Sequence, residues 1–133
     1  MIRVWLMKLG EKLIHLPELL IIYFAPAGGQ LFVVAMAVLC DTATGVWAAR
    51  KAGEKITSRR LADIFPKLIV YFLIILLAHT IENVFKIDIG GLSVRSVVAL
   101  AILGNELMSI DENLKKATGK GVFQKVIEAI KRK

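Results

Sequence analysis

Four residues with polar or charged side chains lie inside stretches of sequence that are otherwise apolar. They are Asp41, Arg95, Asn105 and Glu106. A charge within a membrane-spanning helix is costly, so it usually lines a polar path or pairs with another group. Arg95 and Glu106 are eleven residues apart, too far to pair within one helix. We therefore expect Arg95 to pair between subunits or with Asp41.

The helix predicted around Asp41 inserts weakly into a membrane. An aspartate at the centre of a span costs about 2.5–3.5 kcal/mol, and each Leu, Ile, Val or Phe contributes about 0.3–0.6 kcal/mol in favour of insertion. Residues 31–49 contain seven such apolar residues, which only offset the aspartate. We expect assembly with other subunits to supply its partner. Alternatively, a shifted helix places Asp41 near the headgroups, with Trp47 as an interfacial anchor.

Small residues share the helical face of Asp41. Steps of four, four and three residues connect Ala37, Asp41, Gly45 and Ala48. Such a stripe lets a neighbouring helix approach closely. Asn105 and Glu106 lie near the end of their apolar stretch, so they suit an interfacial cap as well as a buried polar link. The sequence therefore predicts pore or assembly residues at Asp41, Arg95, Asn105 and Glu106.

Enzymatic chemistry has no visible basis in the sequence. The two histidines, His15 and His79, lack the spacing of metal ligands, and Cys40 is the single cysteine. The serines have no adjacent base in sequence, and the glycine pairs show no phosphate-loop pattern. We expect no catalytic site, no metal and no cofactor.

The composition identifies the elements that must carry these residues. The chain has 133 residues, of which 56% are hydrophobic, more than is usual for a soluble domain. This length allows one domain. Residues 31–49, 64–81 and 92–110 are each long enough to cross a hydrocarbon core of about 30 Å as a helix. The predicted fold class is an all-α integral membrane protein with these three transmembrane helices.

Residues 1–30 leave several alternatives open. Polar residues recur at spacings of three to five opposite Trp5, Leu6, Leu9 and Leu13, a pattern typical of an interfacial amphipathic helix. Residues 13–24 also suit a short fourth span that would form a hairpin with the next one through the turn-rich string APAGGQ. A cleaved signal peptide is a further alternative, although polar residues run deep into its apolar part.

The C-terminal segment, residues 111–133, is polar and basic. Val122, Phe123, Val126, Ile127 and Ile130 share one face of a predicted amphipathic helix. The basic residues of its end are Lys125, Lys131, Arg132 and Lys133. A helix of this kind is suited to an anionic membrane surface.

The basic residues also predict the topology. The loop between the first two spans and the entrance of the second carry Arg50, Lys51, Lys55, Arg59, Arg60 and Lys67. The segment 82–91 carries Lys86 alone. By the positive-inside rule the first loop is cytoplasmic, and the basic tail, two spans later, is cytoplasmic as well. Lys67 can extend its ammonium group to the interface. We expect a multi-pass membrane protein whose C-terminus is cytoplasmic.

Several motifs in a fixed order resemble a known family. The run VLCDTATGVWAARKAGEKITS contains Asp41 and Gly45 and ends in a basic loop. Lys67 then opens an apolar span, and LGNELMSIDENL precedes the basic tail. From about Leu31 to Leu114 the chain resembles the toxin-secretion and phage-lysis holin family. It departs from the family pattern at LADIFP, residues 61–66, where the family often has glycines.

The resemblance implies a protein of the bacterial cytoplasmic membrane that oligomerises with itself and opens a lesion. A cell-wall hydrolase (endolysin) or a toxin would leave the cell through that lesion. Membrane lipids are the other expected partner, and no nucleic acid is expected. Two other functions fit the residues: a small proton-coupled exporter, and a membrane anchor or adaptor with a lipid-binding tail.

Overall fold

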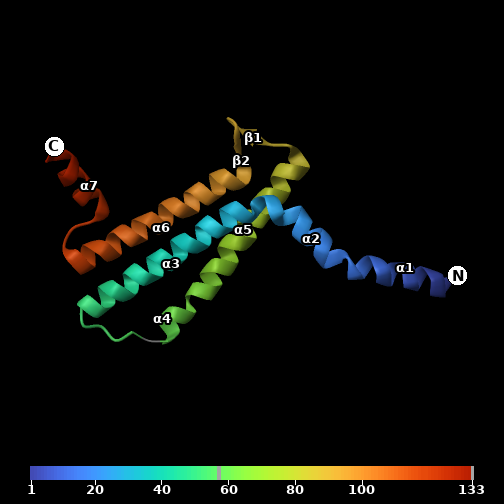
Figure 1. The fold of residues 1–133 in the computed structure, drawn as a ribbon, viewed down its shortest axis with the longest axis horizontal. Coiled ribbons are helices and arrows are strands. Elements are labelled where there is room, and N and C mark those ends of the chain that lie inside the picture. The colour runs from blue at the N-terminus through green and yellow to red at the C-terminus, as the bar shows by residue number, and fades with distance from the viewer. Residues whose placement is uncertain (57, 133) are drawn as a thin grey trace.

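The computed structural model describes residues 1–56 and 58–132, apart from the side chains of Arg3, Trp5, Leu6, Lys8, Leu9, Glu11, Arg59 and Arg60. The chain is built almost wholly of helices, as predicted (Figure 1). The elements in order are α1 (Ile2–Ile14), α2 (Leu16–Phe24), the 3-10 turn η1 (Ala25–Ala27), α3 (Gly28–Lys51), α4 (Ser58–Ala62), α5 (Ile64–Phe85), β1 (Asp88–Ile89), β2 (Leu92–Ser93), α6 (Val94–Thr118) and α7 (Val122–Lys131).

Helices α3, α5 and α6 pack together. In Figure 1, α3 and α6 lie side by side and run in the same direction, and α5 runs the opposite way. The connection after α3 and the C-terminal end of α6 therefore lie at one end of the bundle. The centre of the bundle is apolar and consists of Ala27, Val34, Ile75, Ala99 and Ile102.

A small β-hairpin connects α5 to α6, although the sequence had suggested no strand. Strands β1 and β2 pair antiparallel around Gly90 and Gly91, whose φ angles are 61° and 84°. Two consecutive residues with positive φ form the tight turn that suits a hairpin, and glycine adopts it without steric cost. The Asp88 carboxylate accepts a hydrogen bond from the Gly91 N–H at 3.2 Å. These two-residue strands are too short to show as alternating polarity in a sequence.

Among the described residues, two helical stretches are long and apolar enough to cross a membrane: Leu16–Lys51 and Ile64–Phe85. The predicted spans 31–49 and 64–81 lie within them. The predicted span 92–110 begins in β2, and its helix α6 continues to Thr118. The charged residues Arg95, Glu106 and Asp111 keep α6 out of this apolar class. A third crossing therefore remains a prediction.

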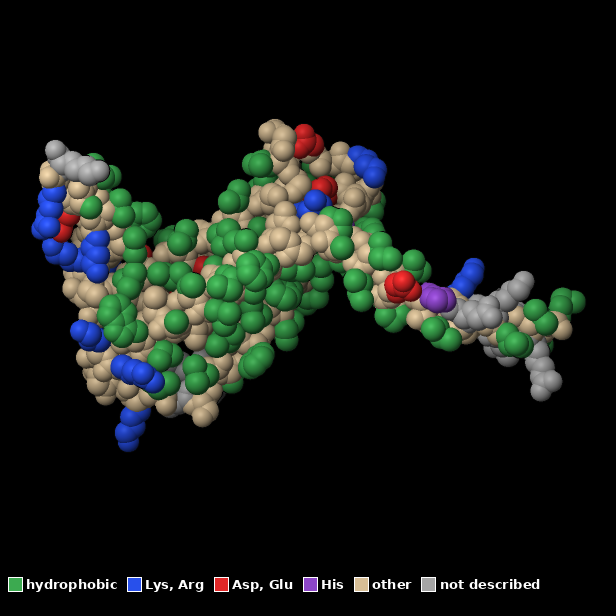
Figure 2. Space-filling model, in the orientation of Figure 1, with side chains coloured by type: hydrophobic (Ala, Val, Ile, Leu, Met, Phe, Trp, Pro, Cys, Tyr) green, Lys and Arg blue, Asp and Glu red, His purple; other side chains and the backbone are tan. Residues whose placement is uncertain are grey.

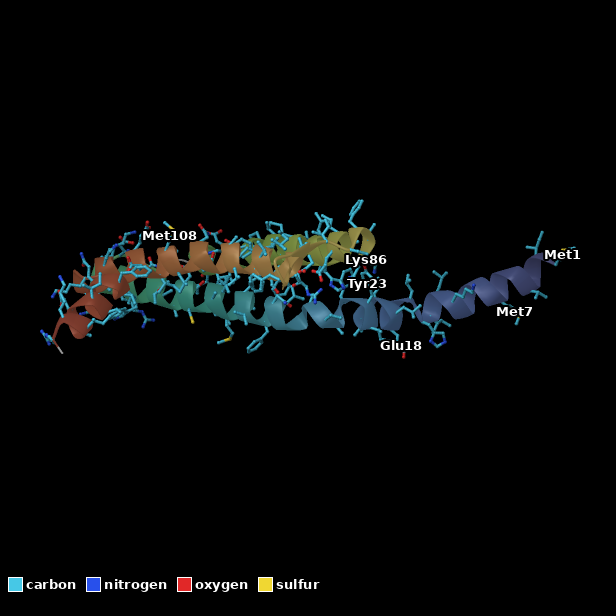
Figure 3. All side chains as sticks on the ribbon, turned by 90° about the horizontal axis from the view of Figure 1, so that it is seen from above. Met1, Met7, Glu18, Tyr23, Lys86 and Met108 are labelled. Atoms are coloured by element: carbon cyan, nitrogen blue, oxygen red, sulfur yellow. The ribbon has the colours of Figure 1, made fainter. Side chains whose placement is uncertain are left out.

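The N-terminal part of the chain continues the line of α3 instead of folding back on it. Helix α2, the turn η1 and α3 form one helical stretch of 36 residues, about 54 Å long at about 1.5 Å per residue. The hairpin that APAGGQ had suggested is thus wrong. Pro26 lacks a backbone N–H, and the chain passes it as a single 3-10 turn without reversing. Helices α1 and α2 project from the bundle as an arm (Figures 1 and 3). The amphipathic prediction for α1 rests mostly on residues whose side chains the structure does not describe.

Candidate functional site in the helix bundle

The residue at the centre of the candidate site is Lys67 of α5, which contacts acids from both neighbouring helices. Its Nζ lies 2.9 Å from Oδ2 of Asp41 on α3 and 2.6 Å from Oε2 of Glu106 on α6. The Glu106 side chain is fully buried, and that of Asp41 is 14% exposed. We call Asp41, Lys67 and Glu106 the lysine cluster. One ammonium group thus joins all three helices of the bundle.

Neutral groups complete the hydrogen bonding of both carboxylates. The Tyr71 hydroxyl donates to Glu106 Oε1 at 2.7 Å, and Asn105 Nδ2 donates to the Tyr71 hydroxyl at 3.2 Å. On the other side, Asn113 Nδ2 donates to Asp41 Oδ1 at 3.0 Å. Buried charges need such additional partners, because Coulomb attraction alone does not offset their loss of hydration. Asn105 and Glu106, two of the three predicted polar residues of α6, take part in this network.

This geometry corrects two expectations from the sequence. The idea that only assembly could supply a partner for Asp41 is wrong, since Lys67 and Asn113 of the same chain provide partners. Lys67 was also expected to extend toward the interface, yet its ammonium group points to two carboxylates between the helices. Pairing within one chain favours insertion more than pairing that waits for assembly, because an unpaired acid in the membrane would oppose insertion of every single subunit.

A periodic signal in the sequence could have identified Lys67 and Tyr71. Lys67, Tyr71, Ile75, His79 and Glu82 follow each other at steps of four, four, four and three, so they share one face of α5. Four of these five residues are polar, although the helix as a whole is apolar enough to cross a membrane. Such a polar stripe indicates an inward face, because lipid-facing positions would remain apolar.

The small-residue stripe of α3 lies where α6 approaches. At Gly45, an added Cβ would lie 3.3 Å from the Asn113 amide nitrogen, so a larger residue would press on the Asp41 partner. Ala48 is buried and Ala37 is half-buried. Close approach at Gly45 is what brings Asn113 within reach of Asp41.

Arg95 belongs to a second polar cluster, at the other end of the bundle. Its Nη1 lies 2.9 Å from Glu82 Oε1 and 3.0 Å from His79 Nδ1. The expected pairing of Arg95 with Asp41 is not found within the chain, because Arg95 lies at the opposite end of the bundle beside Glu82 and His79. Pairing of Arg95 between subunits stays a prediction. We call His79, Glu82 and Arg95 the histidine cluster.

His79 also connects this cluster to the N-terminal arm. The side chain is buried, and its Nε2 lies 2.8 Å from the Tyr23 carbonyl oxygen. Since a carbonyl only accepts, Nε2 carries the proton and Nδ1 accepts from Arg95. The Tyr23 and Phe24 rings pack on the imidazole at centroid distances of 5.1 and 5.7 Å. Figure 3 shows Tyr23 where the arm meets the bundle.

An apolar layer separates the two clusters. It contains the buried side chains Val34, Ile75, Ala99 and Ile102. Near its histidine-cluster side, Gln30 of α3 donates to the Ser96 hydroxyl of α6 at 3.1 Å. Along α3 and α6 the polar groups are separated by eleven residues, about 16 Å, which is roughly half the thickness of a hydrocarbon core. We call this layer the apolar waist.

A cleft of about 540 Å³ opens beside the lysine cluster at the end of the bundle that carries the α3–α4 connection. Asp41, Lys67, Ser109, Asn113 and Lys116 are among its lining residues. The cleft gives the lysine cluster a polar side, in contrast to the apolar waist. Among the described residues, no group of three or more histidine, cysteine, aspartate or glutamate side chains could hold a metal ion.

The predicted basic residues gather at the same end of the bundle. Arg50 and Lys51 end α3, and Lys55 lies in the connection that follows. The tail residues Lys125, Lys131 and Arg132 belong to α7 or its end. Figure 2 shows Lys and Arg side chains clustered at that end, whereas hydrophobic side chains dominate the surface between that end and the arm. The side chains of Arg59 and Arg60, and Lys133 as a whole, lie outside the described residues.

Two long apolar helices, ion pairs between helices and basic residues at one end are typical of a helical membrane protein. Comparison with known families gives the more specific identification. The model of the bacteriophage holin family matches residues 19–132, so the chain belongs to this family. It is a holin-type protein of the cytoplasmic membrane, and the family is not one of enzymes. Comparisons with curated proteins and with solved structures gave no match.

Proposed function

We propose that the protein is a holin whose subunits assemble in the bacterial cytoplasmic membrane and open a pore or lesion. A cell-wall hydrolase or a toxin leaves the cell through this opening. Family membership supports the general function. The observation that carries the mechanism is the lysine cluster, which places two acids and a base between membrane helices.

The cluster gives a single subunit a closed state. Within one chain, Lys67 neutralises part of the charge of both acids, so the helices can insert with the charges turned inward. An opening needs a lining that polar side chains hydrate. The polar side chains available for it are Asp41, Asn105 and Glu106 at the lysine-cluster end of the bundle and Arg95 at the opposite end. Subunits that reach a critical number would exchange intrachain contacts for contacts with water and with neighbours. The same residues thus pair with one another while a subunit inserts, and they line the lumen after the subunits have assembled.

The proposed orientation places the α3–α4 connection and the C-terminus in the cytoplasm. The common location of both basic segments at one end of the bundle supports this orientation (Figures 1 and 2), because basic loops stay on the cytoplasmic side. The cleft beside Lys67 would then open toward the cytoplasm. The arm formed by α1 and α2 would begin at the opposite side.

Inducible expression with a co-expressed cell-wall hydrolase tests the function. The informative variant combines Asp41→Asn, Lys67→Met and Glu106→Gln, because it removes all three charges without leaving an unpaired one. We expect it to insert and accumulate normally but to delay or abolish release of the folded hydrolase. Glu112→Gln, an exposed acid on the same helix, is the matched control and should lyse on time.

Lysis by the triple variant at the wild-type time would contradict a role of the cluster in opening. Flux of small solutes without release of the hydrolase would instead favour an exporter. Unchanged permeability of cells that accumulate the wild-type protein would favour a membrane anchor.

A further inference from the structure

Helix α7 presents an apolar face that the rest of the chain leaves uncovered. Val122, Phe123, Val126, Ile127 and Ile130 follow one another at helical spacing, and all five are exposed. The exposed fraction is 63% at Phe123 and 69% at Ile130. No residue of α7 is buried. A face of this size needs an occupant, because a water-soluble tail would have no reason to concentrate its large apolar residues on one side.

The charged residues of α7 are arranged around that face. At 100° per residue, Glu128 lies opposite the centre of the apolar face, whereas Lys131 lies about 40° beyond one edge of that face and Lys125 about 60° beyond the other. Glu128 is paired with Lys120, whose Nζ lies 2.8 Å from its carboxylate. The flanking lysines remain available for anions on both edges of the apolar strip. This order of apolar centre, basic edges and polar back is that of a helix lying in a membrane interface.

The joint between α6 and α7 directs the helix away from the line of α6. Gly119 ends α6 with a φ of 76°, and the Asp111 carboxylate accepts a hydrogen bond from the Val122 N–H at 2.6 Å and contacts Lys115 Nζ at 2.6 Å. An added Cβ at Gly121 would collide with the Asp111 carboxylate, so glycine permits the close approach. Figure 1 shows α7 turned sharply from α6. If α6 crosses the bilayer, α7 runs across its surface.

We propose that α7 is a membrane-surface helix that inserts its apolar face into a leaflet rich in anionic phospholipid. The charge of the segment selects this occupant: residues 111–133 carry seven basic and three acidic side chains. An anionic surface attracts such a segment, whereas the same segment of a second copy would repel it. The proposal rests on the membrane insertion and orientation proposed above, and it does not depend on hydrolase release.

Spin labels on the full-length protein test the proposal. Cys40→Ala provides a cysteine-free background, and single cysteines at 127 and 130 report the apolar face while cysteines at 124 and 128 report the back. The proteins are reconstituted in vesicles of phosphatidylcholine with or without phosphatidylglycerol. In anionic vesicles we expect labels at 127 and 130 to be accessible to oxygen and several-fold less accessible to a water-soluble nickel relaxant than labels at 124 and 128. In neutral vesicles this contrast should shrink.

Two results would overturn the proposal. One is equal access of the nickel relaxant to all four positions in anionic vesicles. The other is protection at 127 and 130 accompanied by spin–spin broadening that disappears on dilution with unlabelled protein, which would show that a second copy covers the face. A paired Lys125→Gln and Lys131→Gln variant should lose the preference for anionic vesicles but keep its helix, whereas Gln124→Ser serves as the matched control.

The lysis assay separates this proposal from the proposed function. Shielded labels in a protein that never releases the hydrolase would contradict the function alone. Timed release with fully water-exposed labels would contradict the surface helix alone.

Discussion

The lysine cluster and the histidine cluster solve the same problem at opposite ends of one bundle, but they solve it differently. In the first, one cation serves two acids from two other helices, and the fully buried Glu106 depends on it. In the second, Arg95 and Glu82 form a simple pair, both 18% exposed, and His79 adds a neutral link to the Tyr23 carbonyl. The lysine cluster therefore joins the bundle itself, whereas the histidine cluster joins α5 and α6 to the arm.

This difference indicates where the bundle is most vulnerable. Removing the shared base leaves two acids without their counter-charge, one of them fully buried, whereas removing Arg95 leaves one acid near the bundle end. Loss of one partner from a buried ion pair is far more destabilising than loss of the whole pair. The following substitutions rank the two clusters on that basis.

Lys67→Met should have the largest effect. It leaves Asp41 and Glu106 as neighbouring acids without a cation, and we expect a loss of about 3–5 kcal/mol of bundle stability. Denaturant titration of the protein in detergent micelles, followed by circular dichroism, measures the change. Lys67→Arg, which keeps the positive charge, should lose much less. The Asn, Met and Gln triple variant should recover most of the stability, and its failure to do so would show that Lys67 acts mainly through packing.

Arg95→Gln should have an intermediate effect. Glu82 would lose a charged hydrogen bond and His79 Nδ1 would lose its donor, a cost of about 1.5–3 kcal/mol. The same titration measures stability, and hydrogen exchange of residues 16–27 reports whether the arm loosens. The Glu82→Gln and Arg95→Gln double variant is the control, because it leaves no unpaired charge. A larger loss than that of Lys67→Met would reverse the proposed ranking.

Asp111, which lies just beyond the predicted span 92–110, should give the smallest effect. The hydrogen bond from Lys115 lowers the pKa of its carboxyl below the usual 3.8, and the Val122 N–H acts in the same direction. A lowered pKa in the folded state means that the contact stabilises the joint above pH 3.8 and is lost as the pH falls through the lowered value. A nickel-accessibility titration of a label at 122 should show this release, and Asp111→Asn should remove the transition.

The sequence predicts those features of the molecule that depend on residues close together along the chain. The apolar lengths predict the two helical stretches that can cross a membrane, and polar residues within otherwise apolar sequence identify Asp41, Asn105 and Glu106. The partner of each charge depends instead on the register between helices that are far apart in sequence. For that reason the sequence indicated neither the bridge made by Lys67 nor the pairing of Arg95 with Glu82.

The N-terminal arm shows a second limit of sequence interpretation. The string APAGGQ contains residues typical of turns, yet glycine and alanine also fit a helix whose surroundings support it. His79 meets the Tyr23 carbonyl beside the 3-10 turn, a contact that spans 56 residues of chain. No local pattern encodes such a contact.

The position of the apolar waist has a consequence for the surrounding lipid. The waist and the two polar clusters lie between the helices, so lipid meets exposed apolar side chains of α5 instead, among them Ile69, Leu73 and Leu77. Helix α5 has 22 residues, about 33 Å at about 1.5 Å per residue, which is close to a hydrocarbon core of about 30 Å. Along this helix a single subunit fits the bilayer without deforming it. Mismatch with the lipid therefore gives two subunits little reason to associate, and their assembly must depend on contacts between them.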